Sequence, residues 1–189
     1  NNIPEDKPIV TLIGRLTNWK GQKLLIEALH LIDDEDFFCV MIGDDQGRKK
    51  YSAELRKMIA KYNMTERFLF IRNVKDIPAA MMVSDVVLST SIEPEAFGRI
   101  AIEGQAMGRV VVASNIGGSV ETVIDGVTGR LYESTSPKAL AEAIKWALHL
   151  STEEREKIGA AGIKNVKEHF TKQIMCDKTI EVYKELINL

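Results

Sequence analysis

The chain has 189 residues, a length typical of a single domain with a sizeable buried core. Hydrophobic residues make up 45% and charged residues 28%, which is ordinary globular composition and excludes a disordered chain. A formal net charge of -2 excludes a broad attraction to nucleic acid or anionic membranes, so any phosphate must be bound by a few placed cations. No apolar stretch approaches the roughly 18 residues that span a membrane.

The cysteines and the first residues bear on the setting of the chain. Cys39 lies in an apolar run, where it is expected to be a small buried hydrophobic residue, and Cys176 lies in a helical pattern. Two distant cysteines predict neither a metal site nor a disulfide framework. We therefore expect a reducing, cytoplasmic setting. No signal peptide is apparent. The first predicted strand starts close to residue 1, so we expect a piece cut at a domain boundary.

Short apolar runs alternate with longer amphipathic segments along the chain. In chain order, we expect strand Pro8–Gly14, helix Lys20–Ile32, strand Phe37–Gly43, helix Lys50–Tyr62, strand Phe68–Ile71, helix Ile77–Val83, strand Asp85–Thr90, helix Gly98–Met107, strand Val110–Ser114, helix Val120–Ile124, strand Gly129–Tyr132, and helices Pro137–Leu150, Thr152–Glu168 and Lys172–Leu189. The second, fourth and fifth strands are nearly continuous apolar runs, which is typical of strands covered on both faces.

This alternation predicts an α/β fold: a doubly wound, Rossmann-like parallel sheet of about six strands with extra C-terminal helices. One domain, residues 1–189, accounts for the whole chain. In such sheets ligands bind at the carboxyl ends of the strands, so functional residues are expected there.

The first candidate site follows the first strand, at Gly14-Arg-Leu-Thr-Asn-Trp-Lys-Gly21. Gly14 permits a sharp turn, and Arg15 and Lys20 bracket a loop that opens a helix. Two cations at a helix N-terminus favour a diphosphate, because backbone N–H groups and the helix dipole attract anions. The glycine spacing fits neither a dinucleotide fingerprint nor a P-loop. The alternative interpretation is a solvated turn.

The second candidate lies between Glu95 and Glu103, after the fourth strand. Glu95 falls on the loop at the carboxyl end of the strand, and Glu103 falls about two turns into the next helix, on or beside a buried face. A carboxylate there needs hydrogen-bond donors, which ligand hydroxyls would supply. The alternatives are a salt bridge to a neighbouring lysine or arginine, or the acid and base pair of a hydrolase.

A third segment, Ser114-Asn-Ile-Gly-Gly-Ser-Val-Glu121, follows the fifth strand. Gly117 and Gly118 permit either close approach to a ligand or a tight turn. Ser119 is a candidate N-cap, and Glu121 would then complement the helix dipole.

Two other features are not expected to be functional. The segment Asp34-Glu-Asp36 has the form of an Asp-x-Asp metal motif but precedes a strand, at the wrong end of the sheet. The histidines lie on helices without ligand spacing, and none is expected to act as a catalytic base: His30, His149 and His169.

Together the three segments resemble the C-terminal, donor-binding domain of retaining glycosyltransferases with the two-domain GT-B architecture, the glycosyl transferases group 1 family. The Gly-Arg-Leu loop, the Glu95-to-Glu103 run and the Gly-Gly-x-x-Glu segment occur in the order of that family, each at the expected strand end. The resemblance covers essentially the whole chain.

The resemblance implies a role for each matching residue. Arg15 and Lys20 would bind the donor diphosphate and stabilise the leaving nucleotide. Glu95 would bind hydroxyls of the transferred sugar, and Glu103 those of the ribose. The implied set is catalytic Arg15, Lys20 and Glu95, with donor-binding Gly14, Arg72, Val74, Phe97, Gly98, Arg99 and Glu103. The family often has glycine where Arg72 stands.

The resemblance also implies a retaining hexosyltransferase that needs no metal or other cofactor. The segments Asp76-Ile-Pro-Ala-Ala80 and Glu93-Pro-Glu-Ala-Phe-Gly-Arg99 look most similar to lipopolysaccharide-core transferases, including mannosyltransferases, which favours GDP-mannose over a UDP-sugar. A missing N-terminal domain would hold a glycan or lipid-linked acceptor, and the full protein would associate peripherally with the inner face of the cytoplasmic membrane. We expect this chain alone to bind nucleotide weakly and to transfer no sugar.

Two further interpretations stay open. A sugar-nucleotide epimerase shares the architecture but needs a histidine facing the sugar. A non-catalytic, flavodoxin-like scaffold domain would have no affinity for nucleotides.

Overall fold

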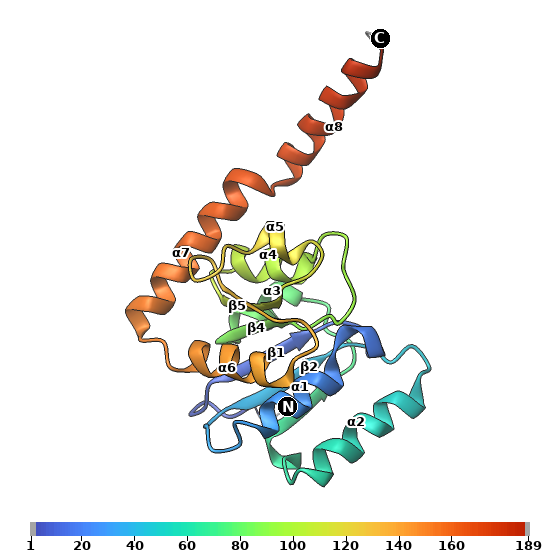
Figure 1. Cartoon of the computed structure of the whole chain (residues 1–189), viewed down its shortest axis with the longest axis vertical. Coiled ribbons are helices and arrows are strands. Elements are labelled where there is room, and N and C mark those ends of the chain that lie inside the picture. The colour runs from blue at the N-terminus through green and yellow to red at the C-terminus, as the bar shows by residue number, and fades with distance from the viewer. Residues whose placement is uncertain (1–2, 188–189) are drawn as a thin grey trace.

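The computed structural model describes residues 3–187 as one parallel sheet with helices on both faces, from which a long C-terminal helix projects (Figure 1). The six strands run in the order β3-β2-β1-β4-β5-β6, and every neighbouring pair is parallel. Their bounds are β1 Ile9–Ile13, β2 Phe38–Ile42, β3 Phe68–Ile71, β4 Val86–Ser89, β5 Val110–Ser114 and β6 Arg130–Tyr132. The predicted doubly wound fold is confirmed.

The strand order reverses between β1 and β4. From β1 the chain builds outward through β2 to β3, then returns to the middle and builds the other way from β4 to β6. The connections that leave the carboxyl ends of β1 and β4 therefore run in opposite directions, and folds of this kind bind ligands where such connections diverge. This topological switch point is where the fold itself places a ligand site.

Alternate residues of each central strand enter two separate apolar layers. Val10 and Leu12 of β1 pack with α1 (Gln22–His30), α2 (Lys49–Lys61) and α6 (Pro137–Leu148). Ile9 and Ile13 pack in the other layer, with α3 (Ile77–Met82) and α4 (Arg99–Ala106). All five residues of β1 are buried, as expected for a strand covered on both faces.

The first helix starts later than its sequence pattern predicts. A short 3-10 turn, η1 (Asn18–Lys20), precedes it, and Gly21 caps α1 with a left-handed φ of 72°. A Cβ on Gly21 would lie 1.9 Å from the carbonyl oxygen of Thr90. The prediction of a helix from Lys20 is wrong because the left-handed Gly21 separates the 3-10 turn from α1, and the contact with the end of β4 leaves no room for a side chain at this residue.

The expectation for Ser119 is also wrong. The short helix α5 (Ser119–Thr122) is preceded by Gly118, which caps it without a side-chain hydrogen bond. Ser119 is therefore the first helical residue, and it is buried. Glu121 does lie in the first turn, as predicted.

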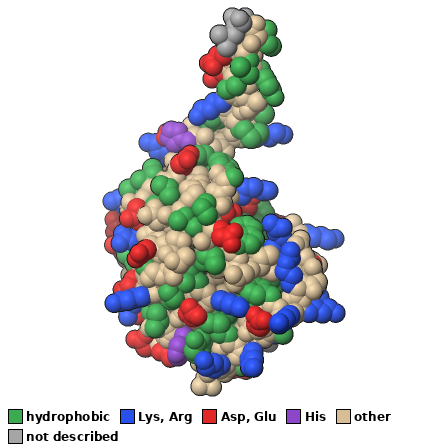
Figure 2. Space-filling view, turned by 45° about the vertical axis from the view of Figure 1, so that its right-hand side comes forward, with side chains coloured by type: hydrophobic (Ala, Val, Ile, Leu, Met, Phe, Trp, Pro, Cys, Tyr) green, Lys and Arg blue, Asp and Glu red, His purple; other side chains and the backbone are tan. Residues whose placement is uncertain are grey.

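The last two helices differ in how they are held. A capping box of Ser151 and Glu154 begins α7 (Thr152–His169), which packs on α4. The projecting helix α8 (Lys172–Ile187) contains no buried residue, and apolar side chains are visible along it in Figure 2. The predicted end of this helix at Leu189 lies outside the described residues. Within residues 3–187, no helix is long and apolar enough to cross a membrane.

Candidate functional site

Two predicted residues, Lys20 and Glu95, meet at the switch point, and Arg15 lies on the same loop as Lys20. Arg15 and Lys20 follow β1, and Glu95 follows β4. Lys20 Nζ lies 2.6 Å from Glu95 Oε1, in an ion pair whose side chains are only 14% and 18% exposed. The Ser91 hydroxyl donates a hydrogen bond to the same carboxylate oxygen. The first two sequence segments thus form one cluster at the carboxyl ends of β1 and β4, where functional residues were expected.

Backbone contacts fasten the two loops to each other. The Ile92 N–H donates to the carbonyl of Trp19 at 2.8 Å, and the Thr90 hydroxyl donates to the carbonyl of Lys20 at 2.9 Å. With the Gly21 contact, these bonds fix the turn that carries Lys20 against the loop that carries Glu95. The ion pair is therefore held from both sides before any ligand arrives.

The glycine pair after β5 supports the same loop. The Gly118 N–H donates to the carbonyl of Glu95 at 2.7 Å. A Cβ on Gly117 would lie 2.5 Å from that carbonyl oxygen, and one on Gly118 would lie 2.6 Å from the backbone of Phe97. Gly117 has a left-handed φ of 55°, as the tight-turn interpretation expects, and both glycines also leave room for the backbone of the loop from Glu95 to Phe97.

The helix α4 begins at this loop without a side-chain cap. Gly98 occupies its N-cap position with a left-handed φ of 72°, and Arg99 is its first residue. The Phe97 side chain turns away from the ion pair, because its ring lies edge-on to Phe170 at a centroid distance of 6.0 Å. Any ligand at the start of α4 would therefore meet the backbone of this turn.

Glu103 is paired within its own helix. Arg99 Nη2 lies 2.6 Å from Glu103 Oε1, and the Glu103 side chain is 33% exposed. The salt bridge that the sequence left open as an alternative is present, so Glu103 has a partner in the ligand-free protein. Both residues line a groove of about 340 Å³ against Ile77 and Met81 of α3.

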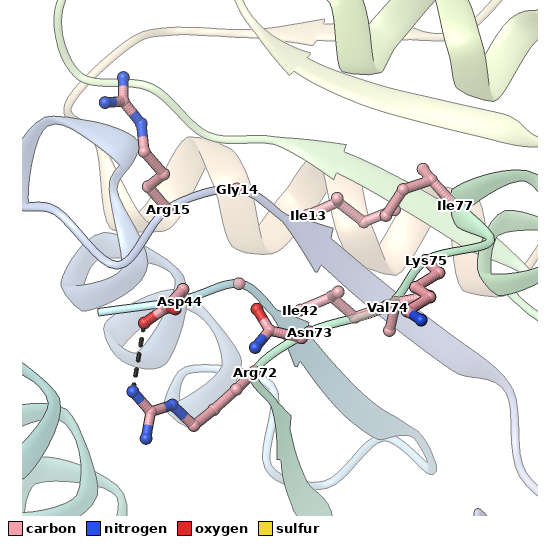
Figure 3. A pocket seen from close by; sticks show the side chains of 11 residues that line it. Ile13, Gly14, Arg15, Ile42, Asp44, Arg72, Asn73, Val74, Lys75 and Ile77 are labelled. Carbon is pink, nitrogen blue, oxygen red and sulfur yellow. Dashed lines mark hydrogen bonds and ion pairs between the residues drawn. The ribbon is translucent and has the colours of Figure 1, made fainter. Parts of the chain in front are cut away.

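A larger cavity of about 550 Å³ opens beside the switch point, at the ends of β1, β2 and β3 (Figure 3). Four of the predicted residues line it: Gly14, Arg15, Arg72 and Val74. Its other walls are mostly apolar and include Ile13, Ile42 and Ile77. Ile77 also lines the groove of Glu103, so the two hollows adjoin.

Asp44 is a cavity residue that sequence reasoning missed. Arg72 Nη2 lies 3.3 Å from Asp44 Oδ1 and 3.4 Å from Asp45 Oδ1, so the guanidinium turns toward the rim. A hydrogen bond from the Gln46 N–H, and next the Arg72 guanidinium, hold the pKa of the Asp44 carboxyl below its usual value. The available signal was position, since Asp44 follows Gly43 at the carboxyl end of β2.

The features set aside in the sequence lie elsewhere. Asp34 to Asp36 precede β2 at the opposite end of the sheet, as predicted. Glu35 there pairs with Lys145 at 2.9 Å and His149 at 2.8 Å, and these hydrogen bonds lower the pKa of its carboxyl. His30 stacks on Tyr62 at 4.1 Å. His169 ends α7.

The reversed strand order and the site at the switch point define a Rossmann-like α/β domain that presents paired charges to a ligand. The sequence profile described as "Glycosyl transferases group 1" matches residues 1–165. The chain belongs to this family of glycosyltransferases.

Solved structures support the same assignment. The chain is similar to a glycosyltransferase from Rickettsia africae ESF-5, with 38% identity and a TM-score of 0.93 over 97% of this chain and 49% of that one. Anabaena Alr3699/HepE, solved in complex with UDP and glucose, gives 29% identity and a TM-score of 0.88 over 95% and 49%. The C-terminal domain of the group 1 protein LpcC from Francisella tularensis gives 25% and 0.78, over 87% of both chains.

A curated relative, spore coat protein SA of Bacillus subtilis, is 31% identical over 95% of this chain and 49% of its own. The chain thus spans about half the length of the first relatives it matches. The matching structures assign the fold to the C-terminal domain of GT-B glycosyltransferases.

Proposed function

We propose that this chain is the donor-binding half of a retaining hexosyltransferase that uses a nucleoside-diphosphate sugar, with GDP-mannose favoured over a UDP-sugar. The observation that carries the proposal is the Lys20–Glu95 pair, 2.6 Å apart at the switch point, on a loop that also carries Arg15, which lines the cavity. The proposed acceptor is a glycan or lipid-linked saccharide, such as lipopolysaccharide core, held by a second domain.

Each charge has a task in this scheme. When the bond between sugar and diphosphate breaks, negative charge develops on the terminal phosphate oxygen, and Arg15, Lys20 and the uncapped start of α4 stabilise it. Three fixed positive groups make a metal unnecessary in this proposal. Glu95 binds hydroxyls of the sugar, and Glu103 those of the ribose. The nucleobase lies in the cavity against Val74 and Arg72.

The ligand-free pairs fit these roles. Glu95 neutralises the largely buried Lys20, and Glu103 neutralises the exposed Arg99. When the donor binds, its phosphates pair with Lys20, and its sugar hydroxyls donate hydrogen bonds to the Glu95 carboxylate. This exchange keeps both residues ionised and in place.

The relatives support the donor class and leave its base open. Anabaena Alr3699/HepE was solved with UDP-glucose. A relative from Mycolicibacterium smegmatis, 30% identical over 74% of this chain, is a GDP-mannose-dependent mannosyltransferase by name. The proposal places the whole protein in the cytoplasm, at the inner face of the membrane. Six large apolar side chains of α8 are exposed, which supports the proposal that another surface covers this helix in the whole protein: Met175, Ile180, Val182, Tyr183, Leu186 and Ile187.

The test is calorimetry and thermal shift with GDP, UDP, GDP-mannose and UDP-glucose. We expect one nucleotide to stabilise the wild type, and Lys20→Ala and Glu103→Ala each to weaken its binding at least about tenfold, or 1.4 kcal/mol. Lys23→Ala is the matched control, because Lys23 also forms an ion pair, with Glu54 at 2.9 Å, but on the surface. Absence of binding, or equal binding by all variants, would favour the scaffold interpretation.

A turnover assay tests the second-domain part of the proposal. We expect residues 1–189 alone to transfer no sugar, because the acceptor has no binding surface. Robust transfer by this chain would contradict that part and leave the donor site intact.

A further inference from the structure

Trp19 stands between the two cations proposed to bind the diphosphate. It lies in the turn η1, between Arg15 and Lys20 in the sequence. Lys20 Nζ lies 4.4 Å from the centroid of its indole ring, and the Arg15 guanidinium carbon lies 5.9 Å from the same centroid. Both charges therefore lie within 6 Å of one aromatic ring.

An aromatic face holds a cation differently from a carboxylate. The ring quadrupole attracts the cation without cancelling its charge, so the cation stays available to an anion on its other side. Glu95 also contacts Lys20, but the carboxylate neutralises the ammonium charge, and this ion pair must break when a phosphate binds Lys20. The indole contact can persist through binding, and it is strengthened because the Lys20 side chain is only 14% exposed.

The turn that carries Trp19 is itself anchored at the switch point. The Trp19 carbonyl accepts the hydrogen bond from Ile92, and Gly21 packs on Thr90 two residues later. These contacts involve backbone atoms, so they remain when the side chain is replaced. A Trp19 variant therefore removes the aromatic surface and keeps the fastening of the two loops.

We propose that Trp19 is a positioning residue, whose indole face orients Arg15 and Lys20 toward the donor diphosphate. This inference rests on the proposed function, because it assigns the two cations to phosphate. Without the ring, Glu95 alone would hold Lys20, the exposed Arg15 side chain would lose its aromatic contact, and the diphosphate would have to order Arg15 on binding.

Calorimetry on the 189-residue chain tests this role with GDP and GMP, and with UDP and UMP. Trp19→Leu should weaken diphosphate binding about tenfold and monophosphate binding less, so the ratio of the two affinities falls. Trp19→Phe should restore most of the ratio, since phenylalanine keeps an aromatic face. Trp146→Leu is the matched control: Trp146 also lies under a cation, Arg130 at 5.6 Å, but away from the site.

A second measurement needs no nucleotide. The side-chain methylenes of Lys20 should show upfield ring-current shifts by NMR in the ligand-free protein, and Trp19→Leu should abolish them. If the wild type binds nucleotides but Trp19→Leu leaves the ratio of diphosphate to monophosphate affinity unchanged, the positioning role alone is overturned. An equal loss of both affinities has the same meaning. Absence of all nucleotide binding by the wild type overturns the proposed function and this role with it, whereas the NMR shifts test the stacking independently.

Discussion

The two halves of the carboxyl edge of the sheet are built differently. On the side of β1, β4 and β5, three loops interlock through backbone hydrogen bonds and glycine contacts around an ion pair less than a fifth exposed. On the side of β2 and β3, the edge is an open cavity whose ion pair, Arg72 with Asp44, involves an arginine side chain that is 67% exposed.

This difference matches the two ends of the proposed ligand. A diphosphate and its sugar need charges held in place before the reaction, because stabilisation of the transition state depends on preorganised groups. A nucleobase needs mainly an apolar wall with a few polar contacts. We therefore expect substitutions on the interlocked side to be costly and those on the open side to be tolerated.

The largest expected effect is that of Gly21→Ala. The substitution places a methyl group 1.9 Å from the Thr90 carbonyl oxygen, at a residue with a φ of 72°. Urea unfolding should show a loss of about 4 kcal/mol or more, since steric overlap is added to backbone strain. Gly126→Ala is the control, because Gly126 has the same φ but nothing within 4 Å. It should cost about 1–2 kcal/mol, the strain alone, and equal losses would show that the loops are not interlocked.

Next in size is the coupling within the Lys20–Glu95 pair. A double-mutant cycle with Lys20→Met and Glu95→Gln should give a coupling free energy of about 1–2 kcal/mol, because both groups are largely shielded from water. The same cycle with Arg99→Met and Glu103→Gln should give at most about 0.5 kcal/mol, as for an exposed pair one helical turn apart. Equal couplings would remove the distinction between the two proposed sugar contacts.

The sequence predicted the fold because its signals are local. Strands β3 and β5 were predicted with their observed ends, since continuous apolar runs bounded by polar residues leave little choice. The start of α1 was wrong for the opposite reason. Gly21 has no room for a side chain because of Thr90, and nothing near Gly21 in the sequence reports that contact.

The site was predictable as a place but not as a set of contacts. The rule for strand ends brought Lys20 and Glu95 to one edge, yet only the structure shows their ion pair. The alternatives for Glu103 depended on the rotamer of Arg99, which spacing leaves undetermined. Asp44 was not predicted because the pair Asp44 and Asp45 after a strand matches no motif of the family.

A smaller effect is expected for Arg72→Gly, which introduces the residue that the family often has. The free energy of unfolding should fall by no more than about 1 kcal/mol, because the Arg72 side chain is 67% exposed, so its ion pairs are weak, and glycine adds a small backbone-entropy cost. If the cavity holds the base, the affinities for guanosine and uridine nucleotides should change relative to each other. A large loss of stability would show that the open side is as interlocked as the other.

The smallest effect concerns the acidity of Asp44. The pKa of its carboxyl lies below the ordinary 3.8, first through the Gln46 N–H and then through Arg72. A lowered folded pKa stabilises the protein above the unfolded pKa, and this contribution is lost as the pH falls through the folded value, so the window lies below about pH 4. In Arg72→Gly, NMR titration should show the Asp44 pKa rising only part of the way, because the backbone bond remains. Lys75→Ala, at another cation lining the cavity, is the control and should leave the pKa nearly unchanged. A complete return to 3.8 in Arg72→Gly would mean that the exposed guanidinium, and not the turn after β2, orders this rim.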